Sequence, residues 1–229
     1  MLVYKYRSGT TRDIEALMNN QFYASSMEIL NDVHEGKIII DNQEIELFDL
    51  LVKNSVSTLD ISIKKDLENL IQIYKNSGVY SLSKDYKNEL LWAYYADSQK
   101  GFCIEYDFNI LKQYPCNEDN FFDIKYSKNV PIINLGSIFD ISILKKSLVT
   151  KSSSWKHEDE IRILTPSKGM FSYFIRAIKS IYFGNRTDKN TIESIMGKLK
   201  GRGVMYYQMA HKKDLYELEK TEIEDMFKA

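Results

Sequence analysis

The sequence contains few residues that break or crosslink a chain. Three prolines and ten glycines among 229 residues leave little material for long linkers or disordered tracts. Only two cysteines are present, Cys103 and Cys116, and their spacing does not match a metal site. Two cysteines are also too few for the disulfide framework of a secreted protein. We therefore expect reduced thiols and a cytoplasmic location.

Neither sign of charge predominates, and long hydrophobic runs are missing. The 31 Lys and Arg residues balance 32 Asp and Glu residues, so the formal net charge is -1. This balance predicts no overall electrostatic attraction to nucleic acid. No hydrophobic run approaches the roughly 20 residues of a membrane-spanning helix, and the first residues lack the apolar core of a signal peptide. We expect a globular protein without a membrane partner.

Short alternating segments are what the sequence does contain. Their alternation and their content of Val, Ile, Tyr and Phe predict strands, and longer segments with helical spacing predict helices. The predicted strands are 2–7, 21–25, 79–83, 101–108, 121–127, 160–164, 177–184, 204–209 and 215–223, and the predicted helices are 12–20, 87–97, 137–151 and 188–201.

Strands outnumber helices without regular alternation, which predicts an α+β fold. We expect a mixed, mainly antiparallel sheet with flanking helices. The whole chain, residues 1–229, is predicted to form a single domain. Apolar residues recur at helical spacing within residues 37–77, which indicates a helical insertion in that domain.

The stretch WKHEDEIRIL, residues 155–164, holds the most concentrated group of charges. If residues 158–164 are extended, Glu158, Glu160 and Arg162 share one face, and Asp159 lies with the isoleucines on the other. The polar face has two interpretations. It is either a solvated row of paired charges at a sheet edge or a carboxylate pair that acts inside a pocket.

Two further groups offer polar side chains to a ligand. Arg7 ends the first strand, where its planar fork of donors suits an anion, although a surface arginine packed along its stem is the alternative. Ser81 and Ser83 share one face of a strand and precede an aromatic helix that contains Trp92. Aromatic residues in such a helix more often belong to a core than to a ligand site.

Metal binding is not predicted. The polar loop at residues 31–35, NDVHE, lacks the ligand spacing of a calcium-binding loop. The three histidines, His34, His157 and His211, are dispersed and show no zinc spacing.

The order of these motifs resembles a bacterial family described as domain of unknown function 2971. The resemblance extends from about Tyr4 to Gly184, and its most specific parts are WAYYADSQKGFCIEYD and WKHEDEIR. Where the family usually has Asn-Asp-Pro-Phe-Glu, this chain has Val33 and His34 in place of the Pro-Phe pair. The family name implies no activity. Its members often resemble components of mobile or antiviral-defence loci, which implies a bacterial defence or toxin effector and an operon-encoded partner.

A second resemblance, to arginine-type ADP-ribosyltransferases, rests on an Arg, a Ser-x-Ser and a Glu-x-Glu in that order along the chain. It implies an NAD-consuming transferase or glycohydrolase with an ADP-ribosyltransferase-like sheet. It also implies that Glu160 stabilises the developing oxocarbenium ion and that Glu158 orients the acceptor, which is an unidentified protein or nucleic acid. The NAD-binding residues implied are Arg7 at the pyrophosphate, Ser81 and Ser83 at the ribose or nicotinamide amide, and the aromatic candidates Tyr6, Trp92 and Trp155 at the nicotinamide ring.

Two alternatives from other functional classes remain open. A nucleic-acid-processing effector would use a basic lip and would stack bases on its aromatic residues. That lip would consist of Lys151, Lys156, Arg162, Lys198, Lys200 and Arg202. A non-catalytic sensor or interaction domain would instead use Glu158, Glu160 and Arg162 as a structural ladder of salt bridges.

Overall fold

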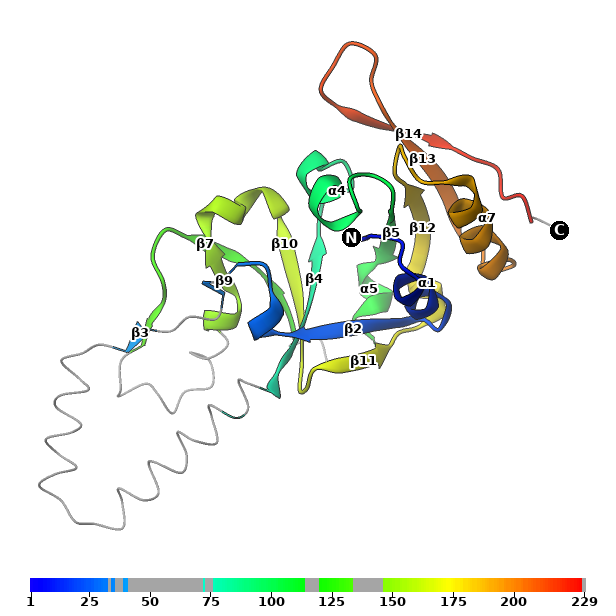
Figure 1. Cartoon of the computed structure of the whole chain (residues 1–229). Helices are drawn as coiled ribbons and strands as arrows, with labels where there is room; N and C mark the ends of the chain where they lie inside the picture. Colours follow the sequence, from blue (N-terminus) through cyan, green and yellow to red (C-terminus); the bar gives the residue numbers. More distant parts are fainter. Residues whose placement is uncertain are drawn as a thin grey trace, which may run out of the picture.

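The computed structural model describes residues 1–32, 34–35, 39–40, 72, 76–113, 120–133 and 146–227 (Figure 1). Most of the predicted helical insertion at 37–77 lies outside these residues, as does most of the helix predicted at 137–151. Among the helices in the described ranges, none is long and apolar enough to cross a membrane.

One large sheet forms the centre of the described structure. Its strands are β1 (Leu2–Arg7), β2 (Gln21–Ser26), β4 (Gly78–Ser83), β5 (Phe102–Asp107), β6 (Phe121–Asp123), β10 (Glu160–Thr165), β11 (Gly169–Ser172), β12 (Ile178–Phe183), β13 (Met205–His211) and β14 (Leu218–Glu222). They follow the order β11-β2-β4-β1-β5-β12-β13-β14, with β10 paired to β4 and to β6. The β12–β13 pair is parallel, and the other described pairs of this sheet are antiparallel. The predicted α+β class with a mixed, mainly antiparallel sheet is confirmed.

Two small parallel pairs lie beside this sheet. β3 (Ile39–Ile40) pairs with β8 (Ile132–Ile133), and β7 (Lys125–Ser127) pairs with β9 (Thr150–Ser152). The single strand predicted over 121–127 is therefore two strands. The chain leaves the large sheet at Ile124, whose N–H donates to the Glu160 carbonyl, while the next N–H donates to Val149. Strand β11 was not predicted from the sequence.

The helices are short and cover parts of both faces (Figure 1). They are α1 (Thr11–Met18), α4 (Glu89–Tyr95), α5 (Phe108–Leu111) and α7 (Lys189–Lys198), with 3-10 turns η1 (Met27–Ile29), η4 (Ser153–Glu158) and η5 (Ile175–Ala177). Asp188, the first residue of the helix predicted at 188–201, caps α7. Thr10 caps α1, where it forms a capping box with Asp13.

Strand β4 lies where the sheet divides. β10 pairs with all six residues of β4 along one edge. The other edge is shared, since β2 pairs with the first two residues of β4 and β1 pairs with its last residue, Ser83. Between these two pairings, the Lys5 ammonium donates to the Ser81 carbonyl at 2.7 Å. The divergence of β1 and β2 from β4 leaves space for a cavity at this point.

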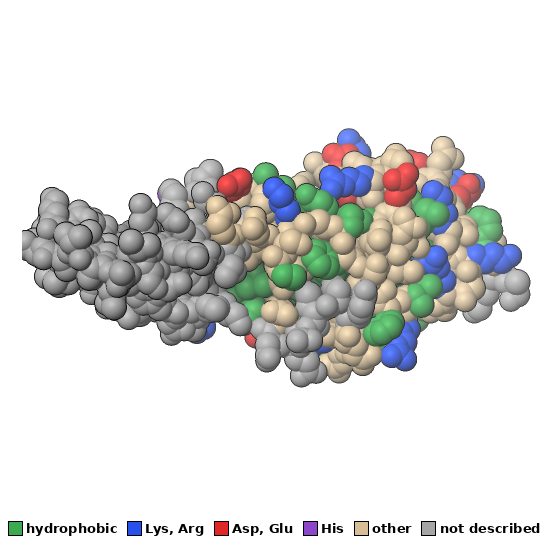
Figure 2. Space-filling model, turned by 90° about the horizontal axis from the view of Figure 1, so that it is seen from below, with side chains coloured by type: hydrophobic (Ala, Val, Ile, Leu, Met, Phe, Trp, Pro, Cys, Tyr) green, Lys and Arg blue, Asp and Glu red, His purple; other side chains and the backbone are tan. Residues whose placement is uncertain are grey.

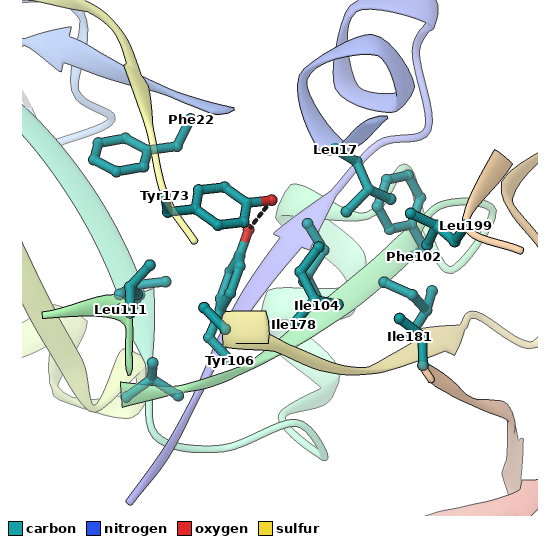
Figure 3. Packing of buried hydrophobic residues seen from close by; sticks show 14 of the residues in the cluster. Leu17, Phe22, Phe102, Ile104, Tyr106, Leu111, Tyr173, Ile178, Ile181 and Leu199 are labelled. Carbon is teal, nitrogen blue, oxygen red and sulfur yellow. Dashed lines mark hydrogen bonds between the residues drawn. The ribbon is translucent and has the colours of Figure 1, made fainter. Parts of the chain in front are cut away.

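Alternation separates a hydrophobic core from a polar face on β4 and β10. Tyr80 and Leu82 of β4 and Ile161 and Ile163 of β10 belong to the main core, part of which is shown in Figure 3. The intervening residues, which include Ser81, face the other side of the sheet. The predicted alternation of residues 160–164 therefore holds.

Candidate functional site

A cavity of about 200 Å³ lies at the division of the sheet. Its walls come from β1, β2, β4, α4, β10 and the segments around residues 29–35 and 151–158. The side chains with a polar group that line it are Tyr4, Lys5, Tyr6, Ser25, Asn31, Glu35, Ser81, Ser83, Tyr95, Lys151, Glu158 and Glu160. Three carboxylates and two amines in one small space make this the candidate site.

A tight turn brings Glu158 and Glu160 into the cavity. Ser152 caps the 3-10 turn η4, and Asp159 then adopts a left-handed conformation with φ 42° before β10 begins at Glu160. Glu158 therefore precedes the strand instead of belonging to it. Asp159 is exposed rather than turned to the core, which corrects its predicted orientation. Both glutamates are nevertheless buried, at 5% and 3% exposure.

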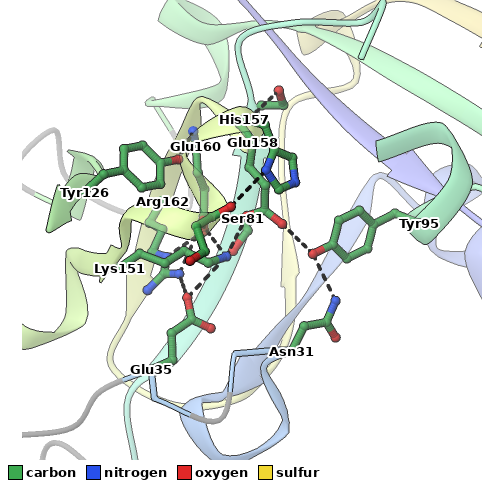
Figure 4. A network of polar contacts seen from close by, with 12 residues as sticks. Asn31, Glu35, Ser81, Tyr95, Tyr126, Lys151, His157, Glu158, Glu160 and Arg162 are labelled. Atoms are coloured by element: carbon green, nitrogen blue, oxygen red, sulfur yellow. Dashed lines mark hydrogen bonds and ion pairs between the residues drawn. The ribbon is translucent and has the colours of Figure 1, made fainter. Parts of the chain in front are cut away.

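Lys151 joins these two carboxylates (Figure 4). Its Nζ lies 2.5 Å from Glu158 Oε2 and 3.1 Å from Glu160 Oε2, and it is 3.5 Å from Glu35 Oε1. Burial lowers the pKa of Lys151, but the attraction of Glu160 and Glu158 outweighs it, so the net pKa is raised. Lys151 therefore stays charged and neutralises the carboxylates.

Arg162 is the second cation of this buried network of charges. It is 0% exposed, its Nε donates to Glu160 Oε1 at 2.6 Å, and its Nη1 donates to the Leu148 carbonyl. Its Nη2 pairs with Glu35. Burial raises the pKa of Glu160, while Lys151 and a hydrogen bond from the Ser81 side chain oppose that shift. The row predicted on one face is thus a buried network and not a solvated sheet edge.

A second set of contacts holds Glu158 from the side of α4. Tyr95 Oη donates to Glu158 Oε1 at 2.7 Å, and Asn31 Nδ2 donates to Tyr95 Oη at 2.9 Å. On the other side, the N–H of Glu160 donates to Tyr126 Oη at 2.8 Å. The Tyr95 bond holds the carboxylate of Glu158, and the Tyr126 bond holds the backbone of Glu160. A binding or catalytic pair requires such fixed positions.

Arg7 does not line the cavity, although Lys5 on the same strand does. The Arg7 guanidinium lies 5.6 Å from the centre of the Tyr80 ring and 3.6 Å from Asp13. Arg7 therefore lies outside the lining of this cavity, and its contact with a pyrophosphate stays a prediction. Lys5 is the basic side chain that β1 presents there. Burial and the neighbouring Arg7 lower the pKa of Lys5 to about 7.

The two predicted serines have different surroundings. Ser83 Oγ donates to the Glu158 carbonyl and accepts the Asp85 N–H, so this hydroxyl is committed to the backbone. Ser81 is half-buried on the face that carries Glu160. Of the two, Ser81 is the better placed to contact a ligand.

The aromatic candidates are mostly structural. Trp92 is 0% exposed, and its Nε1 donates to the Tyr86 carbonyl. Tyr6 packs edge-on against Trp92, and its hydroxyl donates to the Asp85 carbonyl. Trp155 lies outside the cavity lining, with its ring centre 5.0 Å from Lys151 Nζ. Trp92 and Trp155 therefore do not line this cavity, whereas Tyr6 does, and stacking on a nicotinamide ring stays a prediction.

The basic lip is contradicted at two of its residues, because Lys151 and Arg162 are buried and paired with carboxylates. On the face shown in Figure 2, basic and acidic side chains of the described residues are interspersed.

Within the described ranges, no three His, Cys, Asp or Glu side chains are grouped so as to hold a metal ion.

The sequence did not predict that the cavity would bring together Lys5, Glu35 and Lys151. Glu35 and Arg162 are 127 positions apart along the chain, so no local pattern links them. The one available signal was the polar loop at 31–35, which contributes both Asn31 and Glu35.

Residues 91–163 match the model of a family described as protein of unknown function (DUF2971). The segment includes Tyr95, Lys151, Glu158 and Glu160, so it holds much of the buried network. The predicted resemblance to this family is confirmed over residues 91–163. No curated protein and no solved structure matches the chain.

Proposed function

We propose that this protein is an ADP-ribosyltransferase-like enzyme that consumes NAD. The observation that carries the proposal is the convergence of Glu158, Glu160 and Ser81 on one cavity at the division of an antiparallel sheet. Loss of nicotinamide breaks the ribose C–N bond, whose electron pair leaves with nicotinamide, and positive charge develops on the ribose. A buried carboxylate held in place stabilises such a charge more than water does.

Each cavity residue has a proposed role in that reaction. Glu160 stabilises the oxocarbenium ion, and Ser81 bonds a ribose hydroxyl or the nicotinamide amide. Glu158 orients the acceptor, with Tyr95 holding its carboxylate. Lys5 lines the cavity and Arg7 does not, so the Lys5 amine donates a hydrogen bond to the ligand in the place first assigned to Arg7.

The cavity is too small to hold a whole NAD molecule. Ligand pockets for drug-sized molecules measure about 300–1,000 Å³, whereas this cavity measures about 200 Å³. We propose that it holds the nicotinamide riboside half, with the adenosine half outside. The acceptor is a protein or nucleic acid, and an operon-encoded partner in antiviral defence fits the family resemblance.

The test is nicotinamide release from NAD by the purified full chain, with and without bacterial cell extract as a source of acceptor. We expect release by the wild type and loss of release in the Glu160→Gln variant. Folding of the variant is checked by its Tm and circular dichroism. Absence of release from the wild type in both conditions, together with no NAD binding, contradicts the proposal.

A non-catalytic ligand sensor is the second candidate. It is favoured by the ion pairs of Glu160, because both of its carboxylate oxygens already accept from Arg162 or Lys151. A sensor binds its ligand without consuming it. A rise in Tm with NAD or another nucleotide, without nicotinamide release, supports this candidate over the enzyme.

A further inference from the structure

Two lysines line the same cavity in opposite surroundings. Lys151 has three carboxylates within 3.5 Å of its ammonium. Lys5 has no ion pair among the described residues, and Arg7, two positions along the same strand face, is another cation. Lys5 Nζ donates a hydrogen bond to the Ser81 carbonyl at 2.7 Å.

The groups around Lys5 favour a neutral amine. Lys5 and Arg7 both lie over the Tyr80 ring, at 4.8 Å and 5.6 Å from its centre. Asp13 of α1 faces the same region but is paired with Arg7. Burial and Arg7 lower the pKa of Lys5 to about 7, against weaker opposing attraction from the cavity carboxylates.

The two glutamates that attract Lys5 are already neutralised. Glu158 and Glu160 lie within 3.1 Å of the Lys151 ammonium, so their charge is shared with a nearer cation. A neutral Lys5 can donate one N–H to Ser81 and keep its lone pair available to the cavity. A lysine that is desolvated beside another cation is the usual arrangement for an amine nucleophile.

We propose that Lys5 is an amine nucleophile and that the cavity binds small aldehydes or ketones by forming an imine with it. The Lys5 nitrogen attacks the carbonyl carbon, and the carbonyl oxygen is protonated to give a carbinolamine. The nitrogen then loses its proton, the C–O bond breaks, and the oxygen leaves as water. One amine and one carbonyl thus give one imine and one water, without an oxidant or reductant. The proposal does not rest on NAD being a substrate.

The experiment is reductive trapping on the wild-type full chain, which avoids any question of misfolding. The protein is incubated with propanal and cyanoborohydride at pH 7.5, and alkylated lysines are identified by peptide mass mapping over time. Lys5 is expected to react at least about tenfold faster than Lys151 and the exposed Lys156, because a lysine with an ordinary pKa near 10.4 is almost wholly protonated at this pH.

A pH profile and one variant show whether Lys5 reacts fast because its amine is neutral or only because the aldehyde can reach it. The rate at Lys5 should reach half its maximum near pH 7, whereas the rate at Lys156 should keep rising toward pH 10. The Arg7→Gln variant removes the neighbouring cation, so it should slow the reaction of Lys5 at pH 7.5 and leave Lys156 unchanged. Reaction of Lys5 no faster than Lys156 overturns the proposal, whether or not the protein releases nicotinamide.

Discussion

The Lys151 ammonium lies 3.1 Å from Oε2 of Glu160, and both side chains are almost fully buried. Within the described part of the chain this contact joins β9 to the first residue of β10. It holds a carboxylate in the cavity with a counter-charge beside it. The stability and the proposed chemistry of the site both depend on this pair.

Lys151→Met should destabilise the fold strongly. The change removes the cation shared by Glu35, Glu158 and Glu160, and breaking a buried ion pair from one side costs about 3–5 kcal/mol. Urea unfolding followed by circular dichroism measures the loss. Lys156→Met, in the exposed part of η4, is the matched control and should change stability by less than about 0.5 kcal/mol. Equal effects of the two variants would show that the network does not stabilise the fold.

Tyr95→Phe tests the side of the network nearest α4. The lost hydroxyl leaves Glu158 Oε1 without its donor and Asn31 without its acceptor. We expect a loss of about 1–3 kcal/mol in the free energy of unfolding, because an acceptor that is buried and charged is left unsatisfied. Tyr94→Phe is the control, since that neighbouring residue is 58% exposed. A Tyr95→Phe variant as stable as the control contradicts the described contact.

Lys5 should make the free energy of unfolding depend on pH, with a contribution that rises as pH rises. Its folded pKa of about 7 lies below its ordinary value of 10.5. Between those values the unfolded chain binds more protons than the folded chain, so the contribution of Lys5 to stability rises with pH. The difference in unfolding free energy between wild type and Lys5→Met should therefore shift in favour of the wild type from pH 6.5 to pH 9. A constant difference over that range would show that the folded pKa is not lowered.

Lys220 provides a separate test at the edge of the sheet. Its ammonium lies 4.1 Å from the ring centre of Tyr207 and 5.0 Å from that of Tyr182, whose hydroxyl donates to the buried Glu105. Lys220→Met should cost about 0.5–1 kcal/mol through lost cation–π attraction, since Lys220 is exposed. Hydrogen exchange should quicken in β14, and Lys213→Met in the preceding exposed turn should leave it unchanged. Unaltered exchange in both variants contradicts a role for Lys220 in holding β14.

Local patterns predicted the faces of the central strands well. The alternation in residues 160–164 placed Glu160 and Arg162 together and away from Ile161 and Ile163, as the structure has them. The same pattern failed at Glu158 and Asp159, because the Ser152 cap and the left-handed Asp159 interrupt the extended chain. Over a few residues, a capped 3-10 turn competes with an extended strand. The pattern of hydrophobic alternation does not show which of the two conformations the chain adopts.

The partners of the glutamates could not be predicted in the same way. Lys151 is separated from Glu160 by a turn, and Glu35 comes from a distant loop. Arg7 and Lys5 share a strand face, so alternation alone could not decide which of them lines the cavity. The division of β4 between β1 and β2 decides it, and that division arises from long-range pairing.

The most direct test of the central claim compares Glu160→Gln with Asp159→Asn. Asp159 is adjacent, exposed and left-handed, a conformation that Asn tolerates. Nicotinamide release and NAD binding are measured separately for both variants and the wild type. We predict that Glu160→Gln lowers kcat by about a hundredfold or more, with a Kd for NAD within a few-fold of the wild type, and that Asp159→Asn changes neither. Equal kcat values for the wild type and Glu160→Gln would contradict a catalytic role for the buried carboxylate.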